Sequence, residues 1–416
     1  MRALENSRRT KRSKKLTVAD IPYVGPGTPA GEWFRRYWLV VGTTRDLYDI
    51  PQAVKVLGEE LVLFRDEFDK LGLLGLHCSH RGTSLEYGEI EDGGIRCPYH
   101  GWLYDVRGQC LEMPAEPKDS KFPEKVKHLS YPVREHGGLI FAYMGPDKDD
   151  PPPLPKYSPL IAGGGQRQIE PVRHCDYNWF NFFENSADPA HICILHRHAG
   201  YGEQSWGNHF FSYRDMPEFQ FIEMNYGMKV VMTKPGPTPD TEFADEMSLA
   251  LPSIIQVGDT EFVHAKLDAA ALMRHGSQCE HILFLTPSDD EHFMIFTVDY
   301  YSGPDPLFFE KLKEMRAREV PKQEVKPYDH RKYMPFKGNV RQEDLMTQST
   351  QGLLGIRKEQ LGMSDRGVIK FRKIVLEAIG TARRGGVPKG VVTKERASDI
   401  IQLHSFAGVR AKGAAS

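Results

Sequence analysis

Long apolar runs are missing from this sequence of 416 residues. It has no stretch of about 18 uncharged apolar residues, and its amino terminus lacks the short apolar core of a secretory signal. We therefore expect a cytoplasmic protein that does not enter a membrane. An excess of one charge is also missing, because the formal net charge is −2. This balance gives no reason to expect nucleic acid or a membrane surface as a partner.

Cysteine is scarce, with six residues that lack the dense, even spacing of a disulfide scaffold. In a reducing compartment, the pair Cys78 and Cys97 therefore suggests metal binding. Basic residues are concentrated at the start, where seven of the first fifteen residues are Lys or Arg. We interpret residues 1–22 as a basic, flexible arm.

The length favours two domains. Residues 54–145 read as short β segments separated by turn residues, which predicts a small all-β domain. Residues 147–159 are rich in proline and are followed by Gly163, Gly164 and Gly165, so neither a sheet nor a helix can continue there. We place one domain at 23–155 and the other at 156–416.

The second domain begins with a helical pattern over 177–196 that Pro189 should break or kink. Strand patterns follow, and they predict one sizeable antiparallel sheet. Helical periodicity returns after the sheet. The fold class is therefore α+β. The strand patterns cover 219–232, 251–257, 261–267, 281–286 and 292–301, and the later helices 308–318 and 368–379.

Two cysteines and two histidines form the first constellation, Cys78-x-His80 and, after sixteen intervening residues, Cys97-x-x-His100. Four such ligands could bind structural zinc. Each loop, however, supplies one thiolate and one imidazole, which suits a [2Fe–2S] cluster with both cysteines on one iron and both histidines on the other. The surrounding residues, CSHRGTSLEYG and GGIRCPYHGWLYDVRGQC, match the two Rieske cluster loops.

A second constellation, D-x-x-H-x-x-x-x-H, contains Asp188, His191 and His196. On an ideal helix the two histidines would point about 140° apart, so a broken helix is needed for both to face one ion. Two histidines with one carboxylate would form the facial triad of non-heme Fe(II) oxygenases, which leaves positions open for O₂. Glu343 and Asp344 are the downstream candidates for that carboxylate. His174 and His198 are rival ligands.

Together the two constellations resemble the α subunits of Rieske ring-hydroxylating oxygenases, in particular the phthalate 4,5-dioxygenase branch. The resemblance implies a Rieske β domain joined to a helix-grip (START-like) domain, in a homotrimer. It implies Fe(II) on His191, His196 and Asp344, with Asp188 bridging His191 to His100 of a neighbouring subunit. The chain departs from the family where Asn185, and not the more usual glycine, follows Glu184.

The predicted function is that of a terminal oxygenase. It would use O₂ and a flavin- or ferredoxin-type NAD(P)H reductase to hydroxylate, dioxygenate or O-demethylate a small aromatic compound, with a carboxylated one as a further option. The alternative is a Rieske electron-transfer or ligand-binding protein without oxygenase activity, against which the intact second constellation argues. Candidate substrate contacts are the cations Arg197, Arg214 and Lys229 and the aromatics Phe182, Phe183, Trp206 and Phe210.

Overall fold

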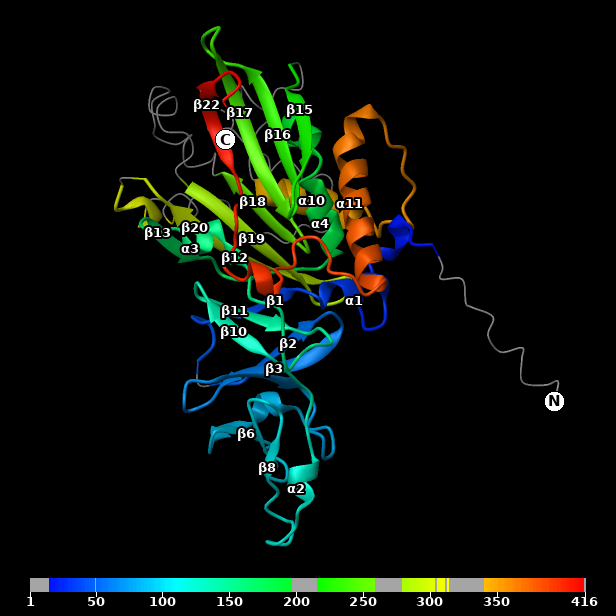
Figure 1. The fold of residues 1–416 in the computed structure, drawn as a ribbon, viewed down its shortest axis with the longest axis vertical. Coiled ribbons are helices and arrows are strands. Elements are labelled where there is room, and N and C mark those ends of the chain that lie inside the picture. Colours follow the sequence, from blue (N-terminus) through cyan, green and yellow to red (C-terminus); the bar gives the residue numbers. More distant parts are fainter. Residues whose placement is uncertain are drawn as a thin grey trace, which may run out of the picture.

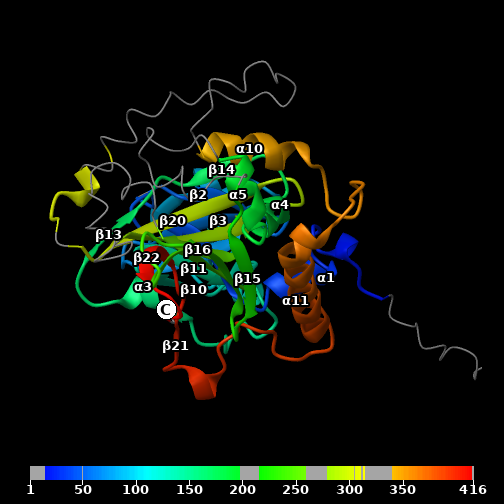
Figure 2. The ribbon, with the colours of Figure 1, turned by 90° about the horizontal axis from the view of Figure 1, so that it is seen from above.

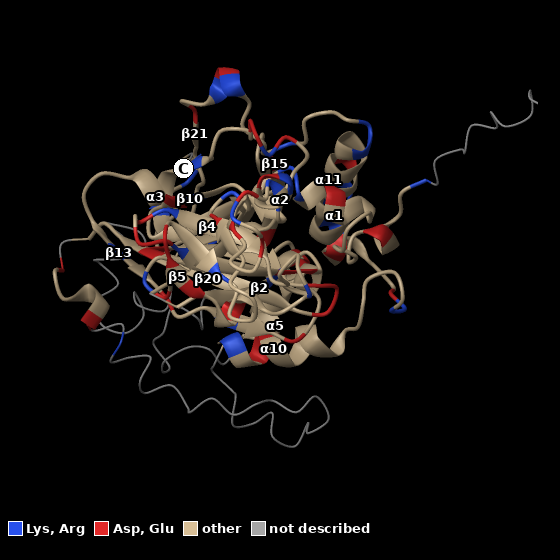
Figure 3. Ribbon diagram, turned by 90° about the horizontal axis from the view of Figure 1, so that it is seen from below, with Lys and Arg blue, Asp and Glu red and all other residues tan. Residues whose placement is uncertain are grey.

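The computed structural model describes residues 15–48, 50–196, 215–258, 279–303, 305–310, 313 and 340–414. Figure 1 shows two parts, with small sheets at one end and a large sheet flanked by helices at the other. Within the described residues, no helix is long and apolar enough to cross a membrane. Basic and acidic positions are interspersed along the ribbon in Figure 3, in keeping with the net charge of −2.

The amino-terminal part contains three small antiparallel sheets, ordered β1-β11-β10, β2-β3-β4-β9 and β5-β6-β7-β8. The last two of these share an apolar core that contains Phe64 and Leu74 from one sheet and Ile95 and Tyr104 from the other. The strands are β1 (Trp38–Thr43), β2 (Gln52–Val56), β3 (Glu59–Arg65), β4 (Leu71–Gly75), β5 (Glu89–Glu91), β6 (Gly94–Arg96), β7 (Leu103–Asp105), β8 (Cys110–Glu112), β9 (Ser130–Tyr131), β10 (Val133–His136) and β11 (Leu139–Tyr143).

The second part is built on a nine-stranded sheet whose main path is β13-β20-β19-β18-β17-β16-β15, with β14 paired to β20 and β22 paired to β17. A short parallel pair, β12-β21, lies outside it. The strands are β12 (Lys156–Tyr157), β13 (Gln166–Ile169), β14 (Arg173–Cys175), β15 (Glu218–Glu223), β16 (Gly227–Pro235), β17 (Thr241–Ala250), β18 (Ile254–Gly258), β19 (Cys279–Pro287), β20 (Phe293–Tyr301), β21 (Ile400–Ile401) and β22 (Phe406–Ala411).

Helices cover one face of this sheet, and Figure 2 shows α4, α5 and α10 on that side with α11 beside β15. Phe293 of β20 contacts Tyr177 and Phe182 at this helical face. Phe284 of β19 points the other way and contacts Phe141 of β11. The helices are α1 (Pro29–Phe34), α2 (Phe122–Lys125), α3 (Ser158–Ile161), α4 (Trp179–Asn185), α5 (Pro189–Ile194), α10 (Val340–Thr350) and α11 (Arg366–Arg383).

Several sequence expectations can be compared with these elements. The predicted helical segment 177–196 is broken as expected, because α4 ends at Asn185 and α5 begins at Pro189. The helix predicted over 368–379 is present as α11. The strand predicted over 261–267 lies outside the described residues, as does most of the helix predicted over 308–318. Strand β17 was not predicted.

The predicted arm needs a correction. Residues 1–14 lie outside the description, but Ile21 is fully buried and the main-chain oxygen of Pro22 accepts a hydrogen bond from Asn178. The end of the arm is therefore part of the fold. Helix α1, which we assigned to the first domain, also packs on the second, since Phe34 contacts Trp179 with ring centroids 4.8 Å apart.

Candidate metal centres

The two cysteine-histidine loops lie side by side. The Cys78 and Cys97 side chains are buried, and the rings of His80 and His100 lie 4.4 Å apart. Each loop turns through a glycine in the left-handed region, Gly82 with a φ of 76° and Gly101 with a φ of 72°. The four predicted cluster residues therefore gather at one place, two buried thiols beside two imidazoles.

These residues fit a Rieske cluster. The Nδ1 atom of His100 is buried and has no hydrogen-bond partner in the described part of the chain, as expected for a nitrogen whose partner is a metal. The hydroxyl of Tyr104 lies 3.3 Å from Sγ of Cys78 and can donate to a cluster thiolate. Gly94 lies in β6, where a Cβ atom would come within 2.1 Å of the main-chain oxygen of Tyr104.

The second constellation converges with a downstream carboxylate. One ligand atom from each of His191, His196 and Asp344 lies within 4.8 Å of the others. Oδ1 of Asp344 is 3.3 Å from Nε2 of His196 and 3.8 Å from Nε2 of His191. His191 lies in α5, which begins at Pro189, His196 follows the end of that helix, and Asp344 comes from α10.

The Nδ1 atom of each histidine forms a hydrogen bond with an oxygen atom. Nδ1 of His191 donates to the main-chain oxygen of Asp188, and Nδ1 of His196 lies 2.8 Å from Oε2 of Glu343. These bonds place the proton on Nδ1 and leave Nε2 for a metal, the usual arrangement of metal-binding histidines. Glu343 therefore lies behind His196, while Asp344 faces the cluster of ligand atoms.

Asn185 is a neighbour of the site that we did not predict as such. Its Nδ2 donates to Oδ1 of Asp344 at 3.2 Å and lies 3.2 Å from Nε2 of His191. The only sequence signal was its departure from the family's usual glycine. The amide connects the end of α4 to ligands from α5 and α10.

The electrostatics of the site favour a cation. Burial opposes the charged form of His196, yet the hydrogen bonds that its ring donates to Asp344 and Glu343 raise its pKa to about 9. Burial would raise the pKa of Asp344, but the neighbouring His196 and His191 lower it. Burial lowers the pKa of His191. One buried carboxylate and a neutral His191 are a suitable donor set for a divalent iron.

The rival residues lie elsewhere or cannot be placed. His174 is exposed on β14, away from the ligand atoms, and His198 lies outside the described residues. Lys229 pairs with Glu246 at 2.6 Å on the sheet face opposite the iron ligands, so it is not a substrate contact. Phe183 packs on Phe371 in the core, while Phe182 contacts Phe293 near the site. Arg197, Trp206, Phe210 and Arg214 also fall outside the description.

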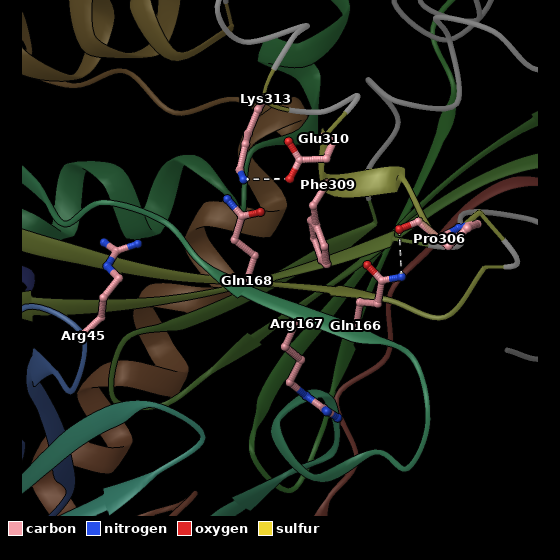
Figure 4. Close-up of a pocket in the computed structure, with 8 residues that line it drawn as sticks. All are labelled: Arg45, Gln166, Arg167, Gln168, Pro306, Phe309, Glu310 and Lys313. Atoms are coloured by element: carbon pink, nitrogen blue, oxygen red, sulfur yellow. Dashed lines mark hydrogen bonds and ion pairs between the residues drawn. The ribbon is translucent and has the colours of Figure 1, made fainter.

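An open depression lies at the sheet edge beside β13 (Figure 4). Lys313 and Glu310 form an ion pair of 3.0 Å there, and Gln166 donates to the Pro306 oxygen. None of the predicted metal ligands lines this depression. We therefore do not assign the reaction to it.

Comparison with known proteins shows the family of this chain. Residues 37–131 match the model of the Rieske [2Fe-2S] domain. The chain is 32% identical over 400 residues to the phenoxybenzoate dioxygenase subunit alpha of Ectopseudomonas oleovorans, covering 92% of this chain and 89% of that one. The chain belongs to the Rieske non-heme iron oxygenases, as an oxygenase (α) subunit.

Two further relatives belong to the same group. The tert-butanol monooxygenase / tert-amyl alcohol desaturase oxygenase subunit of Aquincola tertiaricarbonis is 33% identical over 378 residues, covering 87% of this chain and 76% of that one. The phthalate 4,5-dioxygenase oxygenase subunit of Pseudomonas putida is 27% identical over 416 residues, covering 91% and 89%. The structure of NdmA with caffeine, from Pseudomonas putida CBB5, has the same fold, with a TM-score of 0.63 at 20% identity over 86% and 94% of the chains.

This Rieske oxygenase is therefore the terminal component of a multicomponent enzyme. It uses O₂, a Rieske [2Fe–2S] cluster and a mononuclear iron, and a separate reductase supplies the electrons. The fold is confirmed as α+β, with the Rieske domain before a catalytic domain built on an antiparallel sheet.

Proposed function

We propose that this chain oxygenates a small aromatic acid at an iron held by His191, His196 and Asp344. The convergence of their three ligand atoms carries the proposal. When bound, the iron supplies the site at which O₂ is activated. Glu343 and the Asp188 main chain orient the two imidazoles, and the Asn185 amide holds Asp344 toward them. The protein's part is to fix donor geometry and leave one side open to substrate.

The electrons would enter at a cluster held by Cys78, His80, Cys97 and His100. In Figure 1, β6 and β8 of the cluster region lie well away from α10, which supports electron transfer between subunits and not within one. We propose that Asp188 connects His191 to His100 of a neighbouring subunit in a homotrimer. The proposed domain limits are 23–155 and 156–416. A flavin- or ferredoxin-type NAD(P)H reductase and a cytoplasmic location stay predictions from the sequence.

The substrate class rests on two considerations. Relatives named for phenoxybenzoate and phthalate support an aromatic carboxylate, whereas the relative named for tert-butanol belongs to an aliphatic class. The same three ligands serve hydroxylation, dioxygenation and O-demethylation, since the position of the substrate over the iron decides the product. The first two relatives also make the Rieske-only alternative untenable, because they are oxygenase subunits matched over most of the chain.

The proposal can be tested with purified protein, a surrogate reductase, NADH and ¹⁸O₂, with benzoates, methoxybenzoates and neutral aromatics as substrates. We expect mass spectrometry to find ¹⁸O in a hydroxylated product or formaldehyde release from a methoxybenzoate. The reduced protein should give the low-average-g EPR signal of a cluster with two imidazoles on one iron. A protein that carries both metals and oxygenates none of these compounds would contradict the proposed substrate class.

A further inference from the structure

The helical face of the large sheet carries charged side chains beside the iron ligands. Arg341 of α10 contacts both carboxylate oxygens of Glu170, at 3.1 and 3.2 Å. His281 and Asp299, which are paired across β19 and β20, lie 2.5 Å apart through Nδ1 and Oδ1. These groups are engaged with each other. Arg173 of β14 lies on the same face, paired in register with Ile295.

Arg173 differs from these groups. Its Nε atom is buried and makes no hydrogen bond in the part of the chain that the structure describes. Burial, and then the nearby charge of Arg341, lower the pKa of Arg173. The carboxylate of Glu170 lies near Arg173 but is bonded to Arg341, so two guanidinium groups share one anion there. This excess of positive charge in a buried place is costly, and it points to a second anion that arrives from outside.

Thr297 provides a second, independent observation. It is 3% exposed, and its Oγ1 has no hydrogen-bond partner among the described residues. It follows Ile295 by two positions on β20, so its side chain lies on the same face as Arg173 and one step from it. Two buried polar atoms without a hydrogen-bond partner among the described residues, a guanidinium nitrogen and a hydroxyl oxygen, thus belong to neighbouring positions on one face of the sheet.

The sheet face that carries Arg173 and Thr297 lies close to the iron ligands. Arg173 and Cys175 point to the same side of β14, and the chain then reaches Tyr177, whose hydroxyl donates to Gln348 of α10 at 2.9 Å. On α10, Arg341 precedes Asp344 by three residues, so both lie on one helix face about 4.5 Å apart along the axis. The polar pair therefore lies beside the reaction site and not in a remote part of the fold.

We propose that Arg173 and Thr297 form a carboxylate-binding subsite that orients the substrate over the iron. The guanidinium offers two parallel N–H donors to a carboxylate, and the threonine hydroxyl donates to one of its oxygens. The substrate is then an aromatic carboxylate whose oxidised carbon lies away from the acid group. This inference rests on the proposed function, and it names the residues that select the substrate.

The test measures binding and not only turnover. 3-Methoxybenzoate and its neutral counterpart 3-methoxybenzamide are titrated calorimetrically into the anaerobic, iron-loaded protein. We expect the acid to bind at least about tenfold more tightly than the amide, because only the acid compensates the buried charge. Arg173→Gln should abolish this preference, and Thr297→Val should reduce it about three- to tenfold. Arg45→Gln, which removes an arginine at the sheet edge, should leave it unchanged.

Stability without ligand separates this role from a structural one. A structural arginine would lower the melting temperature when removed, whereas one of two guanidinium groups that share a single carboxylate should leave it unchanged or raise it in Arg173→Gln. If Arg173→Gln does not fold, Arg173 has a structural role and the inference is wrong for that residue, while Thr297→Val still tests the subsite. The subsite would be overturned if Thr297→Val, or Arg173→Gln in folded form, bound the acid and the amide with the wild-type preference. Oxygenation of neutral substrates alone would overturn it too, while the oxygenase activity would stand.

Discussion

The main-chain oxygen of Asp188, and not its carboxylate, accepts the hydrogen bond from Nδ1 of His191. The carboxylate instead caps α5, with Oδ1 accepting from the Ala190 N–H at 3.2 Å. Burial raises the pKa of this carboxyl group. The family resemblance predicts that the carboxylate itself bridges His191 to His100 of another subunit, whereas here the main chain makes the contact with His191. We propose that the second carboxylate oxygen of Asp188 is the atom that reaches His100.

Asp188→Asn should keep the iron and lose electron transfer. The amide oxygen still caps α5, and the main chain still binds His191, but the negative charge that would polarise a second imidazole is gone. Single-turnover stopped-flow of the reduced protein, with iron analysis, measures both properties. Asp188→Ala, which also removes the cap, should in addition lose about 1 kcal/mol of stability. Cluster oxidation at the wild-type rate in an iron-replete Asn variant would refute the bridge.

Adjacent carboxylates on α10 should behave differently when removed. Asp344→Ala should lose the mononuclear iron and all turnover, since its Oδ1 is the atom that faces both histidines. Glu343→Gln should only weaken iron binding, by about 10- to 100-fold, because it acts through His196. Both variants should keep the Rieske absorption spectrum. Full activity in Asp344→Ala would move the ligand role to Glu343.

Tyr104→Phe should lower the reduction potential of the cluster. The hydroxyl lies 3.3 Å from Sγ of Cys78, and a donor to a thiolate stabilises the more negative, reduced state. A hydrogen bond worth about 1–2 kcal/mol corresponds to a shift of several tens of millivolts, at about 59 mV per tenfold for one electron. Redox titration followed by EPR measures it, with the exposed Tyr87→Phe as control. If Tyr104→Phe and Tyr87→Phe had the same cluster potential, the hydrogen bond from Tyr104 to Cys78 would be excluded.

The ion pair between Asp289 and Lys55 joins the two domains, and its contribution to stability depends on pH. Burial would raise the pKa of Asp289, but hydrogen bonds from Lys55, Glu291 and His292 lower it to about 2. A lowered pKa stabilises the fold above about pH 4, and this contribution is lost as pH falls toward 2. After discounting for screening around the half-exposed Lys55, we expect Asp289→Asn to cost about 1 kcal/mol at pH 7.

Urea unfolding monitored between pH 7 and pH 3 measures this effect. The gap between wild type and Asp289→Asn should narrow as pH falls below 4, because the Asp289 carboxylate of the unfolded chain then takes up a proton while that of the folded chain stays ionised. Asp399→Asn, in an exposed pair with Arg396, should change stability little at any of these pH values. A gap that stays constant with pH would show that shape and not charge matters at Asp289.

Local patterns predicted much of this molecule because its chemistry is local in sequence. The cluster loops are short and carry their own glycines, and the helix break follows from Pro189, whose ring cannot continue α4. The downstream carboxylate could be narrowed to Glu343 or Asp344 but not chosen by physics alone. Which of two neighbours points inward depends on how α10 packs, and only the three-dimensional arrangement contains that information.

Long-range pairing explains what was missed. Strand β17 contains Glu242, Asp245 and Glu246, which interrupt its apolar pattern; two of these are neutralised by Arg410 of β22, more than 150 residues later. Lys229 looked like a free cation for the same reason, since its partner Glu246 comes from another strand. Arg173 lies before the metal-binding motif, and no local pattern connects it to Asp344.

Strand β20 is buried along its whole length, and its alternate residues serve different purposes. Ile295, Thr297 and Asp299 face the helices, while Phe296 and Val298 face the other way with Phe284. Inserting or deleting one residue within β20 would exchange these two sets at once. New substrate preferences in this lineage should therefore arise by replacing side chains within the strand, and changes of length should be confined to the turns between strands.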